Sequence, residues 1–290
     1  MRIMVTGAAG TLGSVTCRHL LDVGHDVVAI DRRPSRWGDM SERGIDLRQA
    51  GVIDALMAGC AAVVHLASHT SEAGAPSRPE TYLENVTMNA HVFQAASDAG
   101  VGHLIYASSV QIFAGDRYAP GGQRASCLPY LPLDGQEPPC PGNAYAASKE
   151  AGEALLRYHA GHNPGMTCAS VRWPQLADEK RMAFYRTHRP AGGSAAGSML
   201  DVGFSVLALA DAAVFIQSVV ELPMPGYHQW LPASEQNRLG WSAARLCEQF
   251  YPNVPLRKPV ESLDALVDLA PLRERFNWRP RHSQLAGAVS

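Results

Sequence analysis

The sequence lacks an excess of charge of either sign. Its 290 residues include 25 Lys and Arg against 27 Asp and Glu, so the formal net charge is −2. This balance excludes the basic surface that binds nucleic acid and the polybasic patch that binds an anionic membrane. Hydrophobic residues make up 46% of the chain and charged residues 18%. We therefore expect a globular protein of one large domain, or one domain with a small appendage, whose partner is a small-molecule substrate.

Paired cysteines are also absent. The six cysteines are scattered and form no CxxC pair, which argues against a disulfide framework or a zinc site. His159 and His162 form an HxxH at a predicted helix end without further ligands nearby, so we predict a solvated helix terminus and no metal. Isolated reduced thiols favour a cytoplasmic location. The cysteines are Cys17, Cys60, Cys127, Cys140, Cys168 and Cys247.

Targeting and membrane signals are missing as well. The chain enters an apolar run at 2–6 without the charged and apolar regions of a signal peptide, so we expect none. The longest apolar stretch, 202–220, is long enough to raise the question of a membrane span. Asp211 lies at its middle and the stretch also contains Ser205, which favours a buried strand followed by a helix. Asp211 is then expected to cap a helix that opens at Ala212.

Short apolar runs alternate with helical patterns through the first part of the chain. Strands that alternate with helices predict βαβ units, and therefore a parallel sheet covered on both faces. The expected fold class is α/β, a Rossmann-type doubly wound parallel sheet with a small C-terminal substrate-binding lobe. The predicted strands are 3–6, 26–31, 61–66, 104–108 and 167–171, and the predicted helices are 11–23, 80–99 and 143–159.

The regular pattern breaks after this core. Residues 114–143 are rich in proline and glycine without periodicity, and a stretch of this length in a compact domain is typical of a functional loop or lid. The end of the chain mixes short patterns with prolines, which predicts a less regular lobe. We expect the Rossmann domain to comprise residues 1–171 and 201–221, and the substrate-binding lobe to comprise residues 172–200 and 222–290.

A glycine-rich segment joins the first predicted strand to the first predicted helix. Gly7, Gly10 and Gly13 allow the backbone to turn tightly, to approach a pyrophosphate and to pack the helix against the strand. The helix start at Thr11 and Leu12 offers backbone N–H groups and a partial positive charge to phosphates. Glycines alone are a weak signal. Here a strand precedes them, an amphipathic helix follows them, and an acid lies at the end of the next strand. We predict a dinucleotide site, with a glycine-rich turn that binds nothing as the alternative.

Asp31 ends the second predicted strand, where its carboxylate can accept hydrogen bonds from the ribose hydroxyls of an adenosine. A 2′-phosphate would meet a like charge there, so Asp31 favours NAD over NADP. Arg32 and Arg33 follow directly, and an arginine here could bind a 2′-phosphate or stack on the adenine, which keeps NADP possible. Asp46 and Leu47 lie where a second acidic residue could touch the adenine, with a solvated turn aspartate as an equal alternative.

Tyr145 and Lys149 are four residues apart in a predicted helix. Tyrosine has a pKa of about 10 and is a poor base at neutral pH. A lysine one turn away lies on the same face, and its ammonium stabilises the phenolate and lowers the pKa of the tyrosine. Ser109, after a predicted strand, would hydrogen-bond the reacting hydroxyl or carbonyl. We predict that Tyr145 is the general base of a hydride transfer. The alternative is a partly buried tyrosine beside a surface lysine.

These features together resemble a known family. The chain is similar to the extended short-chain dehydrogenase/reductases, and more specifically to their NAD-dependent epimerase/dehydratase branch. The similarity is strong through the predicted Rossmann core, weakens after it and returns near the C-terminal end. It is carried by the glycine-rich segment, Asp31, His65-Leu66-Ala67, Asn85, Ser108-Ser109, the run from Pro138 to Lys149, and the run from Phe276 to Arg281.

The resemblance implies roles for particular residues. Ser109 would be the catalytic hydroxyl that acts with Tyr145 and Lys149, and Asn85 would lie near the backbone of the active site. Lys149 would also hold the nicotinamide ribose. A homodimer formed through the helices that hold Asn85 and Tyr145 is implied as well. The residues implied to contact the cofactor, besides those already described, are Leu66, Ala67, Ser68, Asn85, Tyr145, Lys149 and Pro174.

Departures from the family pattern narrow the expected reaction. Residues 110–111 are Val-Gln, where the family's 4,6-dehydratases carry Asp-Glu and its uronate dehydrogenases carry Asn-His. No carboxylic acid is therefore in place for elimination of water. The run 171–175 lacks the asparagine usual in nucleotide-sugar 4-epimerases. Arg181, Arg186 and Arg189 could hold a substrate diphosphate or carboxylate, or simply form a solvated basic segment.

We therefore expect an enzyme, an NAD-dependent oxidoreductase or epimerase that acts on a secondary hydroxyl of a sugar or nucleotide-sugar. Two alternatives stay open. An NAD(P)-dependent dehydrogenase or carbonyl reductase on a non-nucleotide substrate, such as a sugar acid, would show net NADH turnover, whereas an epimerase regenerates its cofactor. A non-catalytic NAD-binding module would bind cofactor but be indifferent to Tyr145→Phe.

Overall fold

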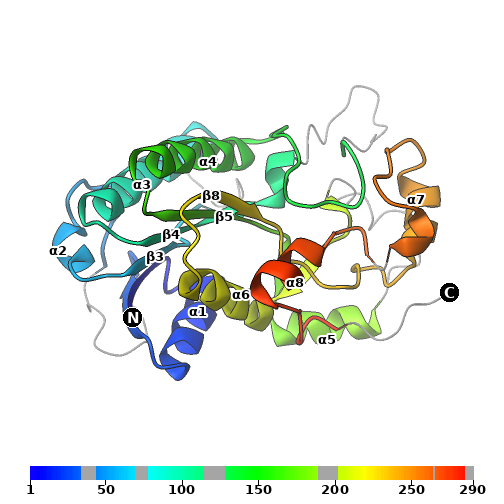
Figure 1. The fold of residues 1–290 in the computed structure, drawn as a ribbon, viewed down its shortest axis with the longest axis horizontal. Coiled ribbons are helices and arrows are strands. Elements are labelled where there is room, and N and C mark those ends of the chain that lie inside the picture. Colours follow the sequence, from blue (N-terminus) through cyan, green and yellow to red (C-terminus); the bar gives the residue numbers. More distant parts are fainter. Residues whose placement is uncertain (34–43, 70–77, 114–127, 189–201, 264, 285–290) are drawn as a thin grey trace. The chain divides into compact units, whose positions relative to one another are not determined.

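The chain forms two compact units in the computed structural model (Figure 1), which describes residues 1–33, 44–69, 78–113, 128–188, 202–263 and 265–284. The first unit is Met1–Ser108, Ala144–Val171 and Ala212–Gln229, and the second is Ser109–Asn143, Arg172–Asp211 and Trp230–Ser290. These bounds differ from the expected ones, because the segment after Ser108 belongs to the second unit and the segment up to Gln229 to the first.

A six-stranded sheet organises the first unit, in the order β2-β1-β3-β4-β5-β8. The pairs β1–β2, β1–β3 and β3–β4 are parallel. From β1 the chain passes to β2 on one side and then to β3 on the other, so the strand order reverses between β1 and β3. Ligands of such sheets bind beyond the carboxyl ends of the strands at this point. The strands are β1 (Arg2–Thr6), β2 (Asp26–Ile30), β3 (Ala62–His65), β4 (His103–Ser109), β5 (Thr167–Trp173) and β8 (Gly226–Trp230).

Helices cover both faces of this sheet (Figure 1), with α3 and α4 side by side on one face and α1 and α6 on the other. The pair α1 and α6 is joined by a 2.7 Å hydrogen bond between His19 and Gln217. A short helix, α2, lies between β2 and β3. The helices are α1 (Thr11–Asp22), α2 (Asp54–Met57), α3 (Arg78–Asp98), α4 (Ala144–His162) and α6 (Leu209–Glu221), and a 3-10 helix, η1 (Val110–Phe113), follows β4.

The core between the sheet and the α3–α4 layer is apolar. Strands buried on both faces read as continuous Val, Ile, Leu and Ala runs, as parallel sheets require. Phe93 from α3 packs edge-on against Tyr106 from β4, with ring centroids 5.4 Å apart. Other fully buried members are Met4, Val63, Val92, Leu104, Leu156 and Cys168. This core fixes α3 and α4 on the sheet and thereby fixes the side chains that they carry.

The second unit is less regular. Its two-stranded parallel sheet pairs β6 (Gln175–Ala177) with β7 (Val206–Ala208), and its helices are α5 (Glu179–Thr187), α7 (Ala243–Phe250), α8 (Ala270–Phe276) and the 3-10 helix η4 (Val260–Ser262). Leu131 and Leu133 are fully buried and form isolated bridges with Leu256 and Val267. The described part of the expected lid, residues 128–143, is thus packed into this unit, and residues 114–127 lie outside the described residues.

The predicted elements are confirmed in type, with ends that move by a few residues. The apolar stretch 202–220 contains β7 followed by α6, as expected. The sequence did not predict β8, a half-buried strand at the edge of the sheet, because its residues, GYHQW, show no apolar alternation. Among the described residues, none of the helices combines the length and the apolar character needed to cross a membrane.

Candidate active site

The loop between β1 and α1 has the backbone geometry that a dinucleotide phosphate requires. Gly7 has a φ of +69°, and a Cβ there would lie 2.7 Å from the Ala67 nitrogen. A Cβ on Gly13 would collide with the Gly7 carbonyl oxygen. Gly10 precedes the first helical residue, Thr11, and its N–H donates to the Gly7 carbonyl over 2.9 Å. Because only glycine leaves this space free against the start of α1, the loop fits a pyrophosphate.

Asp31, directly after β2, ties that strand to the glycine-rich loop. Its Oδ2 accepts from the Ala9 N–H over 3.0 Å, and its Oδ1 accepts from the Arg33 N–H over 2.9 Å. The Arg33 guanidinium lies 3.7 Å from the same carboxylate and donates to the Ala9 carbonyl. Arg32 is exposed. A carboxylate at this strand end suits ribose hydroxyls, and the guanidinium beside it suits a phosphate, so both NAD and NADP are chemically compatible with the site.

The segment after β3 lies against the end of β1. The Leu66 N–H donates to the Thr6 carbonyl over 3.2 Å, and the Ala67 N–H donates to Thr6 Oγ1 over 3.3 Å. Ser68 Oγ donates to the next carbonyl in the chain. Leu66 and Ala67 are therefore brought beside the Gly7 turn, where the sequence placed cofactor-lining residues.

Tyr145 and Lys149 lie together on α4. Lys149 Nζ is 5.5 Å from the centroid of the Tyr145 ring and 4.9 Å from that of the Tyr106 ring, and it donates to the Ala107 carbonyl over 2.7 Å. Burial lowers the pKa of Lys149 from 10.5 to about 7. The alternative of a surface lysine is wrong, because Lys149 is only 2% exposed. An ammonium held here can stabilise a phenolate on its neighbour.

Asn85 connects the segment after β3 with α4. Its Oδ1 accepts from the His69 N–H over 2.8 Å, and its Nδ2 donates to the His69 carbonyl and to Ser148 Oγ, over 3.1 and 2.9 Å. Ser148 Oγ in turn donates to the Tyr145 carbonyl over 2.7 Å. Asn85 is buried, as its expected place near the active-site backbone requires. The side chain fixes the His69 backbone relative to the helix that carries Tyr145.

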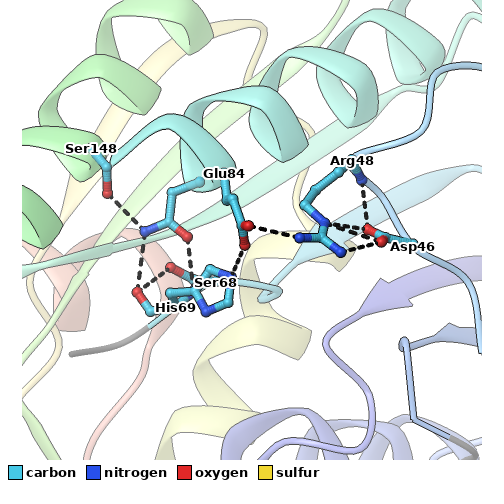
Figure 2. A network of polar contacts seen from close by, with 7 residues as sticks. Asp46, Arg48, Ser68, His69, Glu84 and Ser148 are labelled. Carbon is cyan, nitrogen blue, oxygen red and sulfur yellow. Dashed lines mark hydrogen bonds and ion pairs between the residues drawn. The ribbon is translucent and has the colours of Figure 1, made fainter. Parts of the chain in front are cut away.

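Glu84, the residue before Asn85, joins two loops through charged contacts (Figure 2). Its carboxylate lies 2.5 Å from His69 Nε2 and accepts from Arg48 Nη1 over 2.7 Å. Arg48 also donates to both carboxylate oxygens of Asp46. Burial raises the pKa of Glu84, but the hydrogen bonds from Arg48 and His69 outweigh it, so its pKa is lowered. The side-chain contacts thus run from Asp46, after β2, to His69, after β3.

Asp46 and Leu47 therefore differ from both sequence interpretations in detail. The Asp46 carboxylate is neither free nor merely solvated, since the hydrogen bond from Arg48 lowers its pKa to about 2. Leu47 is buried in the core, and its carbonyl accepts from His91 over 2.9 Å. Any adenine contact through Asp46 has to share its carboxylate with Arg48, whereas Leu47 contributes packing under that loop.

The sequence pattern did not predict the buried carboxylate on α4. Glu153 is fully buried and accepts from Ser108 Oγ over 2.7 Å and from Ser170 Oγ over 2.8 Å. It lies one turn after Lys149 on α4, and this helical spacing was the available signal. The two hydroxyls offset part of the desolvation cost of the carboxylate and join β4, β5 and α4.

Ser109 and Pro174 belong to the second unit. Ser109 ends β4 and is 6% exposed, and its Oγ accepts from the Gln111 N–H over 3.2 Å. Gln111 also accepts from Asn143 Nδ2 over 3.1 Å. Pro174 is buried between β5 and β6. Ser109 therefore lies at the end of a strand, an element that can hold a functional side chain in place.

Two predictions, for His159 and for Asp211, are wrong. His159 is 3% exposed and packs edge-on against Phe93, so it is a core residue and only His162 is exposed. Asp211 lies inside the first turn of α6 and does not cap it, since the helix begins at Leu209. Its carboxylate instead accepts from the backbone N–H groups of Arg281 and His282. Both roles depend on partners distant in the sequence.

The arginines after β6 have different surroundings. Arg186 on α5 donates to the backbone carbonyls of Gln284 and His282, over 2.9 and 3.3 Å. Arg181 is exposed, and its N–H donates to Asp178, which caps α5. Arg189 lies outside the described residues. The Arg186 guanidinium thus already donates to two backbone carbonyls, which leaves fewer of its donors for a diphosphate.

Nothing in the described segments resembles a metal centre, since no three His, Cys, Asp or Glu side chains there are grouped to bind an ion. The cysteines that the structure describes, Cys17, Cys60, Cys140, Cys168 and Cys247, are free thiols, and Cys127 lies outside that part of the chain.

Comparison with known families identifies one match. The profile described as "NAD dependent epimerase/dehydratase family" matches residues 3–185, which is more than half of the chain. The matched segment contains the glycine-rich loop, Asp31, Asn85, and the Tyr145 and Lys149 pair.

Two relatives and one solved structure also resemble the chain. The L-arabinose 1-dehydrogenase (NAD(P)(+)) of Haloferax volcanii is 31% identical over 183 residues, which cover 62% of this chain and 70% of the relative. The NAD-dependent glucose-6-phosphate dehydrogenase of the same organism is 29% identical over 218 residues, 66% of this chain and 77% of the relative. A solved structure of UDP-glucose 4-epimerase from Bifidobacterium longum, with NAD+ and UDP, has a TM-score of 0.69 at 16% identity, over 99% of this chain and 96% of the other, which shows a likeness of fold.

Proposed function

The chain belongs to the NAD dependent epimerase/dehydratase family, and from this premise we propose that it is an NAD-dependent oxidoreductase acting on a secondary hydroxyl of a sugar. The observation that carries the proposal is the pair on α4, in which the buried ammonium of Lys149 lies 5.5 Å from the centre of the Tyr145 ring. A tyrosine beside a buried cation is suited to proton transfer at neutral pH, and a dinucleotide-binding loop in the same unit supplies the redox partner.

In this reaction Tyr145 takes the proton of the substrate hydroxyl while the C–O bond becomes a carbonyl. NAD, when bound, would supply the acceptor for the hydride of the same carbon. Lys149 stabilises the phenolate of Tyr145 and holds the nicotinamide ribose, and Ser109 donates a hydrogen bond to the substrate oxygen. Gly7, Gly13 and the start of α1 would bind the pyrophosphate, and Asp31 the adenosine ribose.

A sugar without a nucleotide is the favoured substrate class. Arg186, one of the arginines proposed to hold a diphosphate, is engaged by the carbonyls of His282 and Gln284. The two sugar dehydrogenases of Haloferax volcanii also support this class. An epimerase acting on a nucleotide-sugar is the second candidate, because the fold is shared with UDP-glucose 4-epimerase. It would return the hydride to its substrate and leave no net NADH.

A homodimer through α3 and α4 and a cytoplasmic location belong to the same proposal. Leu83 on α3 supports the dimer, since a leucine that is 60% exposed on that helix is available for contact with a second copy. The free thiols support a reducing compartment. Light scattering of wild type and Leu83→Asp tests the dimer: the substitution is expected to give a monomer, and a wild-type monomer would refute this part.

The test of the reaction is NADH formation by the purified chain with L-arabinose, glucose 6-phosphate and UDP-glucose, each with NAD and with NADP. We expect turnover of at least one of the two substrates without a nucleotide, with NAD as cofactor. Tyr145→Phe should lower this rate by about 10²–10⁴-fold. Tyr158→Phe is the matched control, because Tyr158 lies on the same helix and is 54% exposed. UDP-glucose conversion without NADH accumulation would favour the epimerase. Full activity of Tyr145→Phe would refute the proposed mechanism.

A further inference from the structure

The ammonium of Lys149 contacts a backbone carbonyl and the faces of two tyrosine rings in the core. Its Nζ donates to the Ala107 carbonyl over 2.7 Å and lies 4.9 Å from the centroid of the Tyr106 ring. The other ring belongs to Tyr145. A cation is attracted to the face of an aromatic ring, and more strongly where water is excluded. The position of the Tyr106 ring therefore affects both the position of the Lys149 ammonium and the pKa of Lys149.

Packing against α4 confines the Tyr106 ring. Tyr106 is fully buried, and Phe93 lies edge-on to it. A Cβ on Gly152 would collide with the Tyr106 hydroxyl and would lie 2.7 Å from Asn89 Nδ2. Only glycine at this position of α4 allows the hydroxyl and the amide to meet under the helix that carries Lys149.

A chain of hydrogen bonds runs from that hydroxyl to the end of β1. Asn89 Nδ2 donates to the Tyr106 hydroxyl over 3.2 Å, and Asn89 Oδ1 lies 3.0 Å from His65 Nε2. His65 Nδ1 lies 2.6 Å from Thr6 Oγ1, which also accepts from the Ala67 N–H. Thr6 directly precedes the glycine-rich loop. The chain thus connects the loop proposed for the cofactor with the ring beneath Lys149.

The chemistry of the partners fixes the proton positions along this chain. Burial, and then the charge of Lys149, lower the pKa of His65 to about 3, so the imidazole is neutral. Since Asn89 Oδ1 can only accept, the His65 proton lies on Nε2 and its Nδ1 is bare. Thr6 must then donate to Nδ1 and accept from Ala67. Each hydrogen bond of this chain therefore joins neutral groups and has a defined donor and acceptor. The chain itself adds no charge near the ammonium of Lys149.

We infer that Tyr106, anchored by Asn89 and His65, is a positioning residue for Lys149, and that it couples the lysine to the end of β1. The inference rests on the proposed role of Lys149 in the reaction. The titratable groups that act on Lys149 or on Tyr106 also include Tyr145 and Glu153 on α4, His65 on β3 and Tyr227 on β8. None of them is altered in the variants below, so a change in Lys149 reports on Tyr106 and its anchor.

The composition of the chain makes a direct test possible, since Lys149, Lys180 and Lys258 are its only lysines. Carbon-13 NMR of the whole chain, labelled at lysine Cε and without cofactor, gives a titration curve for each, assigned with Lys180→Arg and Lys258→Arg. In Tyr106→Leu, which removes the ring face, we expect the pKa of Lys149 to fall by about 1 unit, or roughly tenfold in proton affinity. Lys180 and Lys258 should be unchanged.

Two milder variants keep the inference testable if Tyr106→Leu does not fold. Tyr106→Phe keeps the ring and loses the hydroxyl, and Asn89→Leu loses the partner of that hydroxyl. Each is expected to lower the pKa of Lys149 by a smaller amount. The double variant should match Asn89→Leu, because that substitution already removes the hydrogen bond that Tyr106→Phe removes. A Lys149 that titrates as in wild type in every folded variant would overturn the inference.

The outcome is separable from that of the proposed function. The lysine titration needs no substrate, so an unchanged pKa of Lys149 would refute the role of Tyr106 while leaving Tyr145 as general base. Conversely, a fully active Tyr145→Phe would refute the mechanism whatever Lys149 does.

Discussion

Two polar networks on α3 show how burial selects the chemistry of a contact. Asn89 lies in the buried network, in which Thr6, His65 and Tyr106 are all neutral and fully buried. Glu84, one turn earlier and nearer the surface, contacts the charged Arg48 and the imidazole of His69, and Arg48 also pairs with Asp46. These side chains are between 16% and 41% exposed. A charge in the core would cost several kcal/mol, whereas near water it costs little. Lys149 departs from this pattern, because its ammonium is buried in the core and donates to the neutral Ala107 carbonyl.

The buried ammonium of Lys149 supports the proposed function. A buried lysine whose pKa is depressed to about 7 costs stability at neutral pH, and such groups occur where catalysis requires them. The buried network of Asn89 adds no charge of its own beneath Lys149, and the network of Glu84 near the surface holds the two loops after β2 and β3. The three predictions below test this contrast, beginning with the largest effect.

Breaking the buried network should be the most costly change. Asn89→Leu leaves the His65 Nε2–H and the Tyr106 hydroxyl without their partner in the core, and each such group costs about 1–3 kcal/mol. We expect the free energy of unfolding in urea to fall by about 2–4 kcal/mol. Gln94→Leu is the matched control on the exposed side of α3 and should change it by about 0.5 kcal/mol or less. Equal effects of the two substitutions would contradict the contrast.

Removing the buried charge should stabilise the fold. The pKa of Lys149 is about 7 when folded and about 10.4 when unfolded. Lys149 therefore costs no stability above about pH 10.4, where it is neutral in both states. The cost grows as the pH falls towards 7, because the unfolded chain then binds the proton more tightly than the folded one. Lys149→Met should raise the free energy of unfolding by about 2–3 kcal/mol at pH 7 and by less at pH 10, while abolishing turnover.

Lys180→Met, an exposed lysine on α5, is the control for this gain and should show little change at either pH. A loss of stability in Lys149→Met at pH 7, or a gain that does not shrink towards pH 10, would show that the lysine is not held at a cost in the core.

Weakening the charged network should have the smallest effect. Glu84→Gln keeps the shape of the side chain but removes its charge from Arg48 and His69. Because these groups are partly exposed, we expect a loss of less than about 1 kcal/mol that shrinks further at high salt. Urea unfolding at low and high sodium chloride checks this. A loss as large as that of Asn89→Leu, or one that salt leaves unchanged, would contradict the account.

Local patterns carried most of what could be predicted from the sequence. The glycine-rich loop, Asp31, and the Tyr145 and Lys149 pair are each defined by spacing within one or two elements, and a helix fixes the geometry of an i, i+4 pair. For this reason the strand and helix types and the pairing on α4 were predicted correctly. The burial of Lys149 was not certain from the sequence, because an i, i+4 position on a helix can face the core or the solvent.

Contacts between distant segments could not be predicted. Glu84 meets Arg48 and His69 only after β2, β3 and α3 have packed, and Asn89 meets Tyr106 only because Gly152 lets α4 approach. Asp211 likewise binds backbone groups seventy residues later. A polar residue in a sequence does not reveal which distant donor or acceptor the fold will bring to it. The sequence therefore predicts no contact for Glu84 or Asn89, and only a capping role for Asp211.

The central claim is that the buried ammonium of Lys149 makes Tyr145 a usable base. The most direct test is the pKa of the Tyr145 hydroxyl, measured by carbon-13 NMR of ring-labelled tyrosine in wild type and in Lys149→Met, each with NAD bound. The account predicts a pKa below the free value of about 10 in wild type and a rise of about 1 unit or more in the variant. A Tyr145 that titrates at or above 10 in both proteins would contradict it.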